Sequence, residues 1–143
     1  MVKILFVCHG NICRSPMAEF VLKEKARKAG VLDKLQIASA AVSREELGNP
    51  VYPPARRELA RHGIACDGHE ARQITQADYD HFDRIYYMDS SNARYLRRMF
   101  PRDNGKIRPF LSRDVADPWY SGDFTQTWLD VTEGCDAILE EFI

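Results

Sequence analysis

A short apolar run, followed by a polar loop and then a helical pattern, most constrains the fold of this chain. Residues 4–7 are Ile-Leu-Phe-Val, which predicts a buried strand. Residues 8–14 follow as a loop, and apolar side chains then recur at helical spacing over residues 15–29, where Gly30 ends the pattern. Strand, loop and helix in this order favour a parallel sheet covered by helices, with the loop at the sheet edge where such folds bind ligands.

The loop carries a thiol at its first position and a guanidinium at its last. Its sequence is Cys8-His9-Gly10-Asn11-Ile12-Cys13-Arg14. Inward-pointing backbone N–H groups, the start of the following helix and Arg14 all favour a bound dianion such as phosphate. The same positive field favours the thiolate form of Cys8, so the sequence predicts a nucleophile that captures a phosphoryl group covalently.

Three residues of this segment fit that interpretation. Gly10 permits a turn that a Cβ would obstruct, and Asn11 is the non-glycine residue that best tolerates left-handed backbone. Ser15 can place a hydroxyl near the sulfur. A nucleotide-binding loop is disfavoured, because neither Gly-x4-Gly-Lys-Ser/Thr nor Gly-x-Gly-x-x-Gly occurs. The alternative is a structural cysteine that happens to lie near an arginine.

Further strands and helices alternate along the rest of the chain. The patterns predict strands over residues 35–38, 84–88 and 107–109, and helices over residues 55–62, 90–99 and 124–142. Residues 40–54 and 114–123 are expected to be loops, since Gly, Asn, Asp and Pro are frequent there.

Five short motifs are spread along the chain. They are Cys8-x5-Arg14-Ser15, Ser39-Ala40-Ala41 followed by Gly48-Asn49-Pro50, His69-x-Ala71-Arg72-Gln73, Met88-Asp89-x-x-Asn92, and Asp117-Pro118-Trp119-Tyr120. In this order and approximate spacing the chain resembles the low-molecular-weight protein tyrosine phosphatases over nearly its whole length. The resemblance implies a three-layer α/β/α fold with a central, mostly four-stranded parallel sheet, one domain over residues 1–143, and no metal or other cofactor.

The resemblance also implies an activity, the hydrolysis of phosphotyrosine and small aryl phosphates through a cysteinyl-phosphate intermediate. In that family's scheme Cys8 attacks phosphorus, Arg14 and the loop amides hold the phosphoryl oxygens, and Asp117 protonates the leaving phenolate and then activates water. The phosphate-binding loop then comprises His9, Gly10, Asn11, Ile12, Cys13 and Ser15. Ser39 and His69 are implied to support this loop by hydrogen bonding to Asn11 together with Ser15.

The Asp117 segment supplies the second chemical element. A departing phenolate needs a positioned proton donor, and aromatic neighbours can flank a planar substrate ring. Asp114, three residues earlier, is the alternative acid. We expect Trp119, Tyr120 and Glu45 to form the pocket wall, where Glu45 occupies a position that is often aromatic in the family. With His9 at a commonly apolar position, the pocket lip is less apolar on that side.

Three other functions stay open at this point. Protein arginine phosphatases that resemble this family carry threonine at the position of Ile12, so the isoleucine favours phosphotyrosine. An arsenate reductase uses the same loop with two further cysteines close together in sequence, whereas Cys66 and Cys135 are widely separated. A non-catalytic anion-binding module needs no acid, and Asp117 counts against it.

Composition limits the kinds of partner that this chain is expected to bind. The chain has 20 Lys and Arg against 21 Asp and Glu, so its net charge of −1 gives no global basic field for nucleic acid or membrane. The arginine pairs at 56–57 and 97–98 are interpreted as solvated faces, and His62 and His81 as solvated helix-end residues. No His or Cys spacing suits zinc. We expect a monomer or weak homodimer that acts on phosphotyrosine-containing protein.

The cysteines and the amino terminus indicate a cytoplasmic location. No signal-peptide pattern follows Met1, and none of the apolar runs approaches the length of a membrane span. The four cysteines are then expected to be reduced thiols. Because Cys8 and Cys13 share one loop, Cys13 is either a resolving cysteine for oxidised Cys8 or a small apolar residue packed beneath the loop.

Overall fold

Four parallel strands form the central sheet of the protein, whose computed structural model describes residues 1–143. The strands are β1 (Val2–Cys8), β2 (Leu35–Ala41), β3 (Arg84–Tyr87) and β4 (Ile107–Pro109), in the order β2-β1-β3-β4. All three pairings are parallel. The predicted four-stranded parallel sheet is therefore confirmed, with β1 at its centre.

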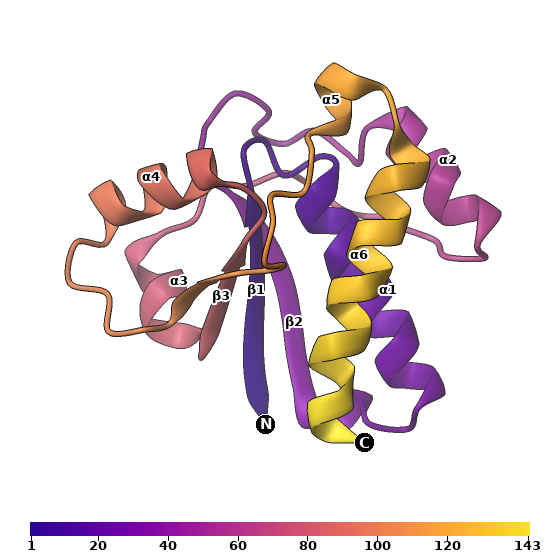
Figure 1. Cartoon of the computed structure of the whole chain (residues 1–143), viewed down its shortest axis with the longest axis horizontal. Coiled ribbons are helices and arrows are strands. Elements are labelled where there is room, and N and C mark those ends of the chain that lie inside the picture. Colours follow the sequence, from indigo (N-terminus) through magenta and orange to yellow (C-terminus); the bar gives the residue numbers. More distant parts are fainter.

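Helices cover both faces of the sheet and complete three layers (Figure 1). They are α1 (Arg14–Lys28), α2 (Pro53–Arg61), α3 (Gln76–His81), α4 (Ser90–Met99), α5 (Pro118–Ser121) and α6 (Phe124–Leu139). Helices α1 and α6 pack together on one face, whereas α3 and α4 lie on the other. No helix is both long enough and apolar enough to cross a membrane.

The apolar run at the start of the chain is explained by burial on both faces of β1. Ile4 and Phe6 belong to the core beneath α1 and α6, whereas Leu5 and Val7 belong to the core beneath α4. All four side chains are fully buried. Successive side chains of a strand point to opposite faces, so a central strand between two helical layers is apolar at every position.

Several predicted boundaries differ from the structure. Strand β2 runs to Ala41 rather than Ala38, because it pairs with the whole of β1, and Ser39 therefore lies within it opposite Phe6. Helix α2 begins at Pro53 rather than Ala55, since proline is tolerated in a first helical turn. The last helix, expected to reach Phe142, ends at Leu139 and continues as a 3₁₀ turn.

Three short elements had no clear apolar period in the sequence and were not predicted. Helix α3 is instead specified at its start, where Thr75 and Asp78 form a reciprocal capping box. Helix α5 lies inside the expected loop over residues 114–123, and a 3₁₀ turn spans Leu32–Lys34. Such short helices depend on caps and packing more than on a repeating pattern.

A glycine lets α6 approach the end of the sheet closely. A Cβ built on Gly134 would clash with the ring of Phe110, the residue that follows β4. The Phe110 ring is buried and packs edge-on against Phe6, with ring centroids 5.5 Å apart. Close packing of α6 therefore requires glycine at this position.

Candidate active site

The loop after β1 leaves the sheet at Cys8 and enters α1 at Arg14. Its middle residue, Asn11, is fully buried and has a left-handed backbone, with φ of 60°. The φ of Gly10 is not in that region. The lack of a side chain at Gly10 instead leaves room for Glu46, because a Cβ there would lie 3.2 Å from Cγ of Glu46. The turn that closes the loop is thus made at Asn11, as its side-chain type predicted.

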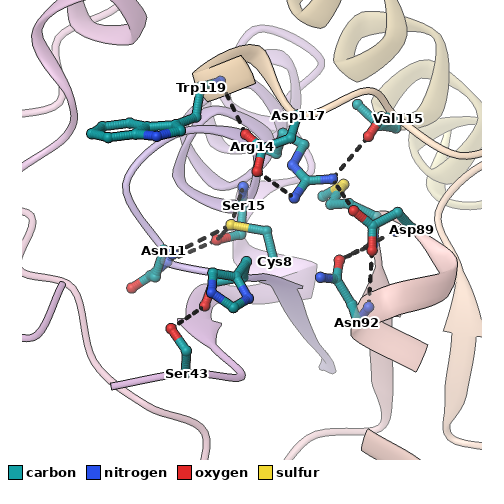
Figure 2. Close-up of polar contacts among 12 residues, drawn as sticks. Cys8, Asn11, Arg14, Ser15, Ser43, Asp89, Asn92, Val115, Asp117 and Trp119 are labelled. Atoms are coloured by element: carbon teal, nitrogen blue, oxygen red, sulfur yellow. Dashed lines mark hydrogen bonds and ion pairs between the residues drawn. The ribbon is translucent and has the colours of Figure 1, made fainter. Parts of the chain in front are cut away.

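The sulfur of Cys8 faces hydrogen-bond donors from its own loop (Figure 2). Backbone N–H groups of Asn11 and Ser15 donate to Cys8 Sγ, with N···S distances of 3.3 and 3.4 Å. The Ser15 hydroxyl lies 3.0 Å from the same sulfur. Helix α1 also starts beside it, so the positive end of the helix dipole adds to this field. The arrangement stabilises negative charge on Cys8, which is what a thiolate nucleophile requires.

The buried Asn11 side chain ties the loop to its surroundings. Its amide nitrogen donates to Ser15 Oγ and Ser39 Oγ, both at 2.9 Å, and its amide oxygen accepts from the Arg72 N–H at 3.2 Å. Nε2 of His69 donates to the Asn11 carbonyl at 2.8 Å. Ser39 and His69 thus lie behind the loop, and these bonds hold Asn11 in a conformation that is otherwise unfavourable.

A second polar layer lies behind Ser39, and no sequence motif indicated it. The Ser39 hydroxyl donates to Oε1 of Glu19 at 2.6 Å, and Glu19 is largely buried on α1. Lys23, one turn further along α1, donates to the other carboxylate oxygen. The carboxylate therefore fixes the direction of the Ser39 hydroxyl, which leaves its lone pairs free to accept from Asn11.

The Arg14 side chain is held by groups from outside its own loop (Figure 2). Its side chain is 2% exposed, and Nη1 donates to Oδ2 of Asp89 at 2.6 Å and to the Val115 carbonyl at 2.8 Å. Nη2 lies 3.4 Å from Oδ2 of Asp117. Burial alone lowers the pKa of Arg14, but the negative charges of Cys8, Asp89 and Asp117 outweigh burial and raise it above its ordinary value. The guanidinium is thus a fixed cation.

A pocket of about 120 Å³ opens above the loop. Its lining residues are Cys8, His9, Gly10, Ile12, Cys13, Arg14, Glu45, Glu46, Asp117, Trp119 and Tyr120. The structure therefore brings the predicted nucleophile, arginine, acid and pocket-wall residues together. Asn11 and Ser15 lie beneath the pocket, and Ser39 and His69 lie behind the loop.

The acid and the aromatic wall come from the short helix α5. Asp117 caps this helix by accepting the Trp119 N–H through Oδ1 at 3.0 Å, which leaves Oδ2 facing Arg14. Trp119 is half exposed, and its ring lies 4.8 Å from that of Tyr52. Tyr120 is 85% exposed. A planar substrate ring can therefore lie against Trp119, whose orientation is supported from behind by Tyr52.

The alternative acid, Asp114, does not line this pocket. Its carboxylate accepts from the N–H and the hydroxyl of Ser90, at 3.2 and 3.1 Å. It borders a separate pocket beside α4. Of the two aspartates, Asp117 alone shares a pocket with Cys8.

The polar lip of the pocket is a histidine–carboxylate pair. Nε2 of His9 lies 3.0 Å from Oε2 of Glu45, which is mostly exposed. The other side of the His9 ring meets Tyr95 of α4 edge-on, with centroids 5.9 Å apart. The less apolar lip expected from these two residues is thus present, and Tyr95 joins it to α4.

The remaining cysteines and histidines differ in their surroundings. Burial and the nearby Cys8 raise the pKa of Cys13, so it is a neutral thiol under the pocket. Cys66 and Cys135 are free thiols elsewhere in the core. His62 is exposed at the end of α2, as expected, and its ring also stacks on Trp128 at 3.6 Å and bonds to the buried Glu58. No group of His, Cys, Asp and Glu side chains could hold a metal ion.

Nearly the whole chain matches one known protein family. Residues 3–142 match the model of the family described as low molecular weight phosphotyrosine protein phosphatase. The chain belongs to that family. It is a low molecular weight protein tyrosine phosphatase, and thus a hydrolase.

Individual phosphatases resemble the chain over nearly its full length. It is 38% identical to the low molecular weight protein-tyrosine-phosphatase YfkJ of Bacillus subtilis, covering 97% of this chain and 94% of that protein. The crystal structure of YfkJ superposes with a TM-score of 0.95 over 99% of this chain and 94% of that chain. The Drosophila arginine phosphatase DARP has a TM-score of 0.88 at 29% identity, covering 99% of this chain and 98% of that chain.

Four residues of this phosphatase's site had no role assigned from the sequence. Asp89 binds Arg14, Glu19 binds Ser39, Tyr52 supports Trp119, and Tyr95 contacts His9. Asp89 alone carried a signal, because it lies within one of the motifs that resemble the family. The other three act through tertiary contacts between distant segments, which no local pattern reveals.

Proposed function

We propose that Cys8 is the nucleophile of this phosphatase and that phosphotyrosine is its substrate. The observation that carries the proposal is the position of Cys8 Sγ, which receives two backbone N–H groups in a pocket shared with Arg14 and Asp117. The sulfur attacks phosphorus and a phosphocysteine forms as the bond to the phenolic oxygen breaks. Arg14 and the loop N–H groups bind the nonbridging oxygens, where charge is concentrated in the transition state.

Asp117 then serves both halves of the reaction. Its protonated carboxyl gives a proton to the leaving phenolate oxygen, and its carboxylate later takes a proton from the water that attacks the phosphocysteine. That second step returns Cys8 as a thiolate and releases inorganic phosphate. The Ser15 hydroxyl, 3.0 Å from the sulfur, stabilises the thiolate as it departs from phosphorus.

The pocket wall favours an aryl phosphate over phosphoarginine. Trp119 offers the face of a ring to a phenyl group, and Ile12 is a buried apolar residue in the pocket. An isoleucine has no hydroxyl to meet a guanidinium, which supports phosphotyrosine although DARP, an arginine phosphatase, is among the similar structures. Polar discrimination of this kind is strong in closed pockets, because an unpaired donor is costly to bury.

Two other functions receive less support from the pocket. A reductase that uses the same loop needs further cysteines in sequence to pass electrons, but neither Cys66 nor Cys135 lines the pocket. A simple anion-binding module needs no proton donor, and Asp117 beside Arg14 is then without a purpose.

Hydrolysis of a chromogenic aryl phosphate tests the proposed nucleophile. Cys8→Ser should lower kcat by about 10³-fold or more, whereas Cys66→Ser, a change at a buried thiol outside the pocket, should keep most activity. EDTA should have no effect, and vanadate should inhibit, because its trigonal form mimics the transferring phosphoryl group. Turnover that survives in Cys8→Ser and is lost with EDTA would contradict a thiol mechanism.

Substrate ranking tests the proposed specificity. The wild type should hydrolyse phosphotyrosyl peptides with higher kcat/KM than phosphoseryl or phosphoarginyl peptides. Ile12→Thr is the informative variant, because it supplies the hydroxyl that Ile12 lacks and should raise the relative rate on phosphoarginine. A wild type that prefers phosphoarginine would assign the chain to arginine dephosphorylation, and arsenate-dependent oxidation of thiols would assign it to arsenate reduction.

We also propose that Cys13 protects Cys8 from irreversible oxidation. Peroxide converts the Cys8 thiolate to a sulfenic acid, and the Cys13 sulfur then attacks this sulfur, forming a disulfide and releasing water. Both thiols are free and buried in one loop, and the charge on Cys8 contributes to the raised pKa of Cys13. Cys13 must lose its proton as it attacks, so disulfide formation should be slow.

Recovery after peroxide treatment tests this protection. The wild type should regain activity with dithiothreitol and yield a Cys8–Cys13 linked peptide by mass spectrometry, whereas Cys13→Ser should recover much less. Equal recovery of the two proteins without a linked peptide would show that Cys13 only packs beneath the loop.

A further inference from the structure

Positive charge is concentrated in one part of a chain that is nearly neutral overall. Residues 90–113 contain seven of the 20 Lys and Arg residues but one of the 21 Asp and Glu residues. Three of these cations, Arg94, Arg97 and Arg98, lie on α4 at positions i, i+3 and i+4. Such positions are neighbours on one helical face. We call these three exposed residues the arginine surface.

The arginine surface has no counterions within the protein. The lysines and arginines that form ion pairs are Arg14, Lys23, Lys25, Arg27, Lys28, Arg56, Arg61, Arg72, Arg84 and Arg113. Like charges at this helical spacing repel one another, so their grouping is unfavourable for the isolated helix. A negatively charged partner offsets this cost when it binds.

The arginine surface is continuous with the mouth of the active site. Tyr95 of α4 meets His9 edge-on at 5.9 Å, directly after the nucleophile, and the guanidinium of Arg98 lies 4.8 Å from the centre of the same Tyr95 ring. Figure 1 shows α4 beside the carboxyl end of the sheet, where the loop after β1 lies. One aromatic ring therefore separates Arg98 from the phosphate-binding loop.

A second connection between the arginine surface and the active site runs along α4. A pocket beside the helix is lined by Ser90 from its first turn and by Arg97 from its last turn. The residue before Ser90 is Asp89, which binds Arg14 in the active site. Arg113 and Asp114 also line this pocket, and Arg113 pairs with Asp130 and Glu133, so the unpaired positive charge beside the pocket comes from Arg97.

We propose that the arginine surface docks an acidic stretch of the same phosphoprotein whose phosphotyrosine enters the active site. This inference rests on the proposed function and adds a sequence preference to it. Arginine is suited to the role, because its planar fork binds a carboxylate through two parallel hydrogen bonds. Glu45 and Glu46 line the pocket mouth, and Glu45 bonds to His9, so the charge changes sign between this lip and the arginine surface and orients the peptide.

The size of the surface favours a short peptide over a polyanion. Outside residues 90–113 the chain has more acidic than basic residues, which repel a nucleic acid or an anionic membrane that extends past α4. Arg94 and Arg98 lie about 8 and 14 Å along the helix axis from Asp89, at 1.5 Å per residue. An extended peptide spans about 3.3 Å per residue, so the acidic residues should lie about two to five positions from the phosphotyrosine.

Matched phosphotyrosyl peptides test the docking proposal. Two peptides carry glutamates at two to five positions before or after phosphotyrosine, and reference peptides carry glutamine there. The wild type should hydrolyse one glutamate peptide with a kcat/KM about tenfold above its reference at low ionic strength. The preference should weaken with added salt, since exposed charges are screened. Equal kcat/KM for all peptides would overturn the proposal.

Two triple variants, each with three positive charges removed, show whether the arginine surface causes the preference for glutamate peptides. Arg94→Gln/Arg97→Gln/Arg98→Gln should abolish the preference, whereas Lys28→Gln/Lys34→Gln/Arg57→Gln, at exposed positions elsewhere, should keep it. The ratio between paired peptides is compared within each protein, so differences in folding or turnover cancel. Equal loss in the two triple variants would show a general charge effect and overturn the proposal.

A binding readout separates docking from catalysis. The unphosphorylated glutamate peptide, with a fluorescent label, should bind the wild type more tightly than its glutamine reference by anisotropy, whether or not the protein hydrolyses phosphotyrosine. A binding difference without any phosphatase activity would refute the proposed function and leave docking intact. Binding of a single-stranded oligonucleotide through the three arginines, with no discrimination between the peptides, would assign the surface to nucleic acid and overturn the proposal.

Discussion

The buried Arg14 and the partly buried Asp89 form a charge pair, with 2.6 Å between Nη1 of Arg14 and Oδ2 of Asp89. The arginine begins α1, and the aspartate is the amino-terminal cap of α4, where it also accepts the Asn92 N–H at 2.9 Å. One carboxylate thus orients the proposed phosphate-binding cation and starts a helix on the other side of the sheet. The pair connects the catalytic pocket to the helix that carries the arginine surface.

The two roles of Asp89 can be separated by substitution. Asn caps a helix about as well as Asp, so Asp89→Asn removes the charge opposite Arg14 and keeps the helix cap. It should lower kcat/KM for an aryl phosphate by about 10- to 100-fold, because Arg14 loses its fixed orientation. Asp89→Ala should lower kcat/KM similarly and should be less stable than Asp89→Asn by about 1 kcal/mol, because it also loses the cap. Steady-state kinetics and urea unfolding measure the two effects, and wild-type kinetics in Asp89→Asn would show that Arg14 needs no such partner.

The two nearby aspartates should differ in their response to the leaving group. Asp117→Asn should lower kcat by roughly 10²- to 10⁴-fold for aryl phosphates with poor leaving groups and less for good ones, which need little protonation. Asp114→Asn serves as the control, because Asp114 bonds to Ser90 outside the pocket. A series of substituted phenyl phosphates gives the dependence. A steeper dependence in Asp114→Asn would move the general acid to that residue.

Much of the fold and the loop could be predicted from the sequence. The apolar run at residues 4–7 indicated a buried strand, and helix α4 and strand β4 were predicted with their observed bounds. Cys8, Arg14 and Asn11 were recognisable because the local backbone of one loop determines their placement. Local patterns work here because strand, turn and helix preferences agree along this segment.

Other parts depend on contacts that no local pattern contains. Glu19 looks like an ordinary exposed helix residue until β2 places Ser39 against it. The short helices α3 and α5 are defined by their caps, the Thr75–Asp78 capping box and Asp117, rather than by periodicity. His62 is an exposed helix-end residue, as expected, but the stacking of its ring on Trp128 from the distant α6 could not be predicted from local sequence.

Gly134→Ala should destabilise the protein, although helix propensity favours alanine over glycine. In an exposed helix, Gly→Ala stabilises by about 1 kcal/mol, but a Cβ here would clash with the ring of Phe110. Gly134→Ala should therefore lower the free energy of unfolding by about 1 to 3 kcal/mol through overpacking. Leu129→Ala, at an exposed position of the same helix, should change it by less than about 0.5 kcal/mol. Urea unfolding compares the variants, and a more stable Gly134→Ala would show that the ring moves aside freely.

Asp78 should make the stability depend on pH in the acid range. Burial raises the pKa of Asp78, but hydrogen bonds from Arg72 and Thr75 outweigh burial and lower it below its ordinary value of 3.8. A lowered folded-state pKa adds stability that is fully present above the unfolded-state pKa. This contribution is lost as the pH falls through the folded-state pKa. Asp78→Asn should thus be less stable than wild type by about 1 kcal/mol at neutral pH, with the difference vanishing in acid. Asp80→Asn, at an exposed neighbour, is the control for urea unfolding, and a difference that stays constant with pH would exclude this charge effect.

Trapping the covalent intermediate tests the central role of Cys8 most directly. Wild type mixed with an aryl phosphate and quenched in acid within a turnover should carry one phosphoryl group, and peptide mass spectrometry should locate it on the sulfur of Cys8. Asp117→Asn should accumulate more of this species with a good leaving group, because the water attack then lacks its base. A phosphoryl group on another residue, or rapid turnover with no phosphoenzyme in either protein, would exclude Cys8 as the nucleophile.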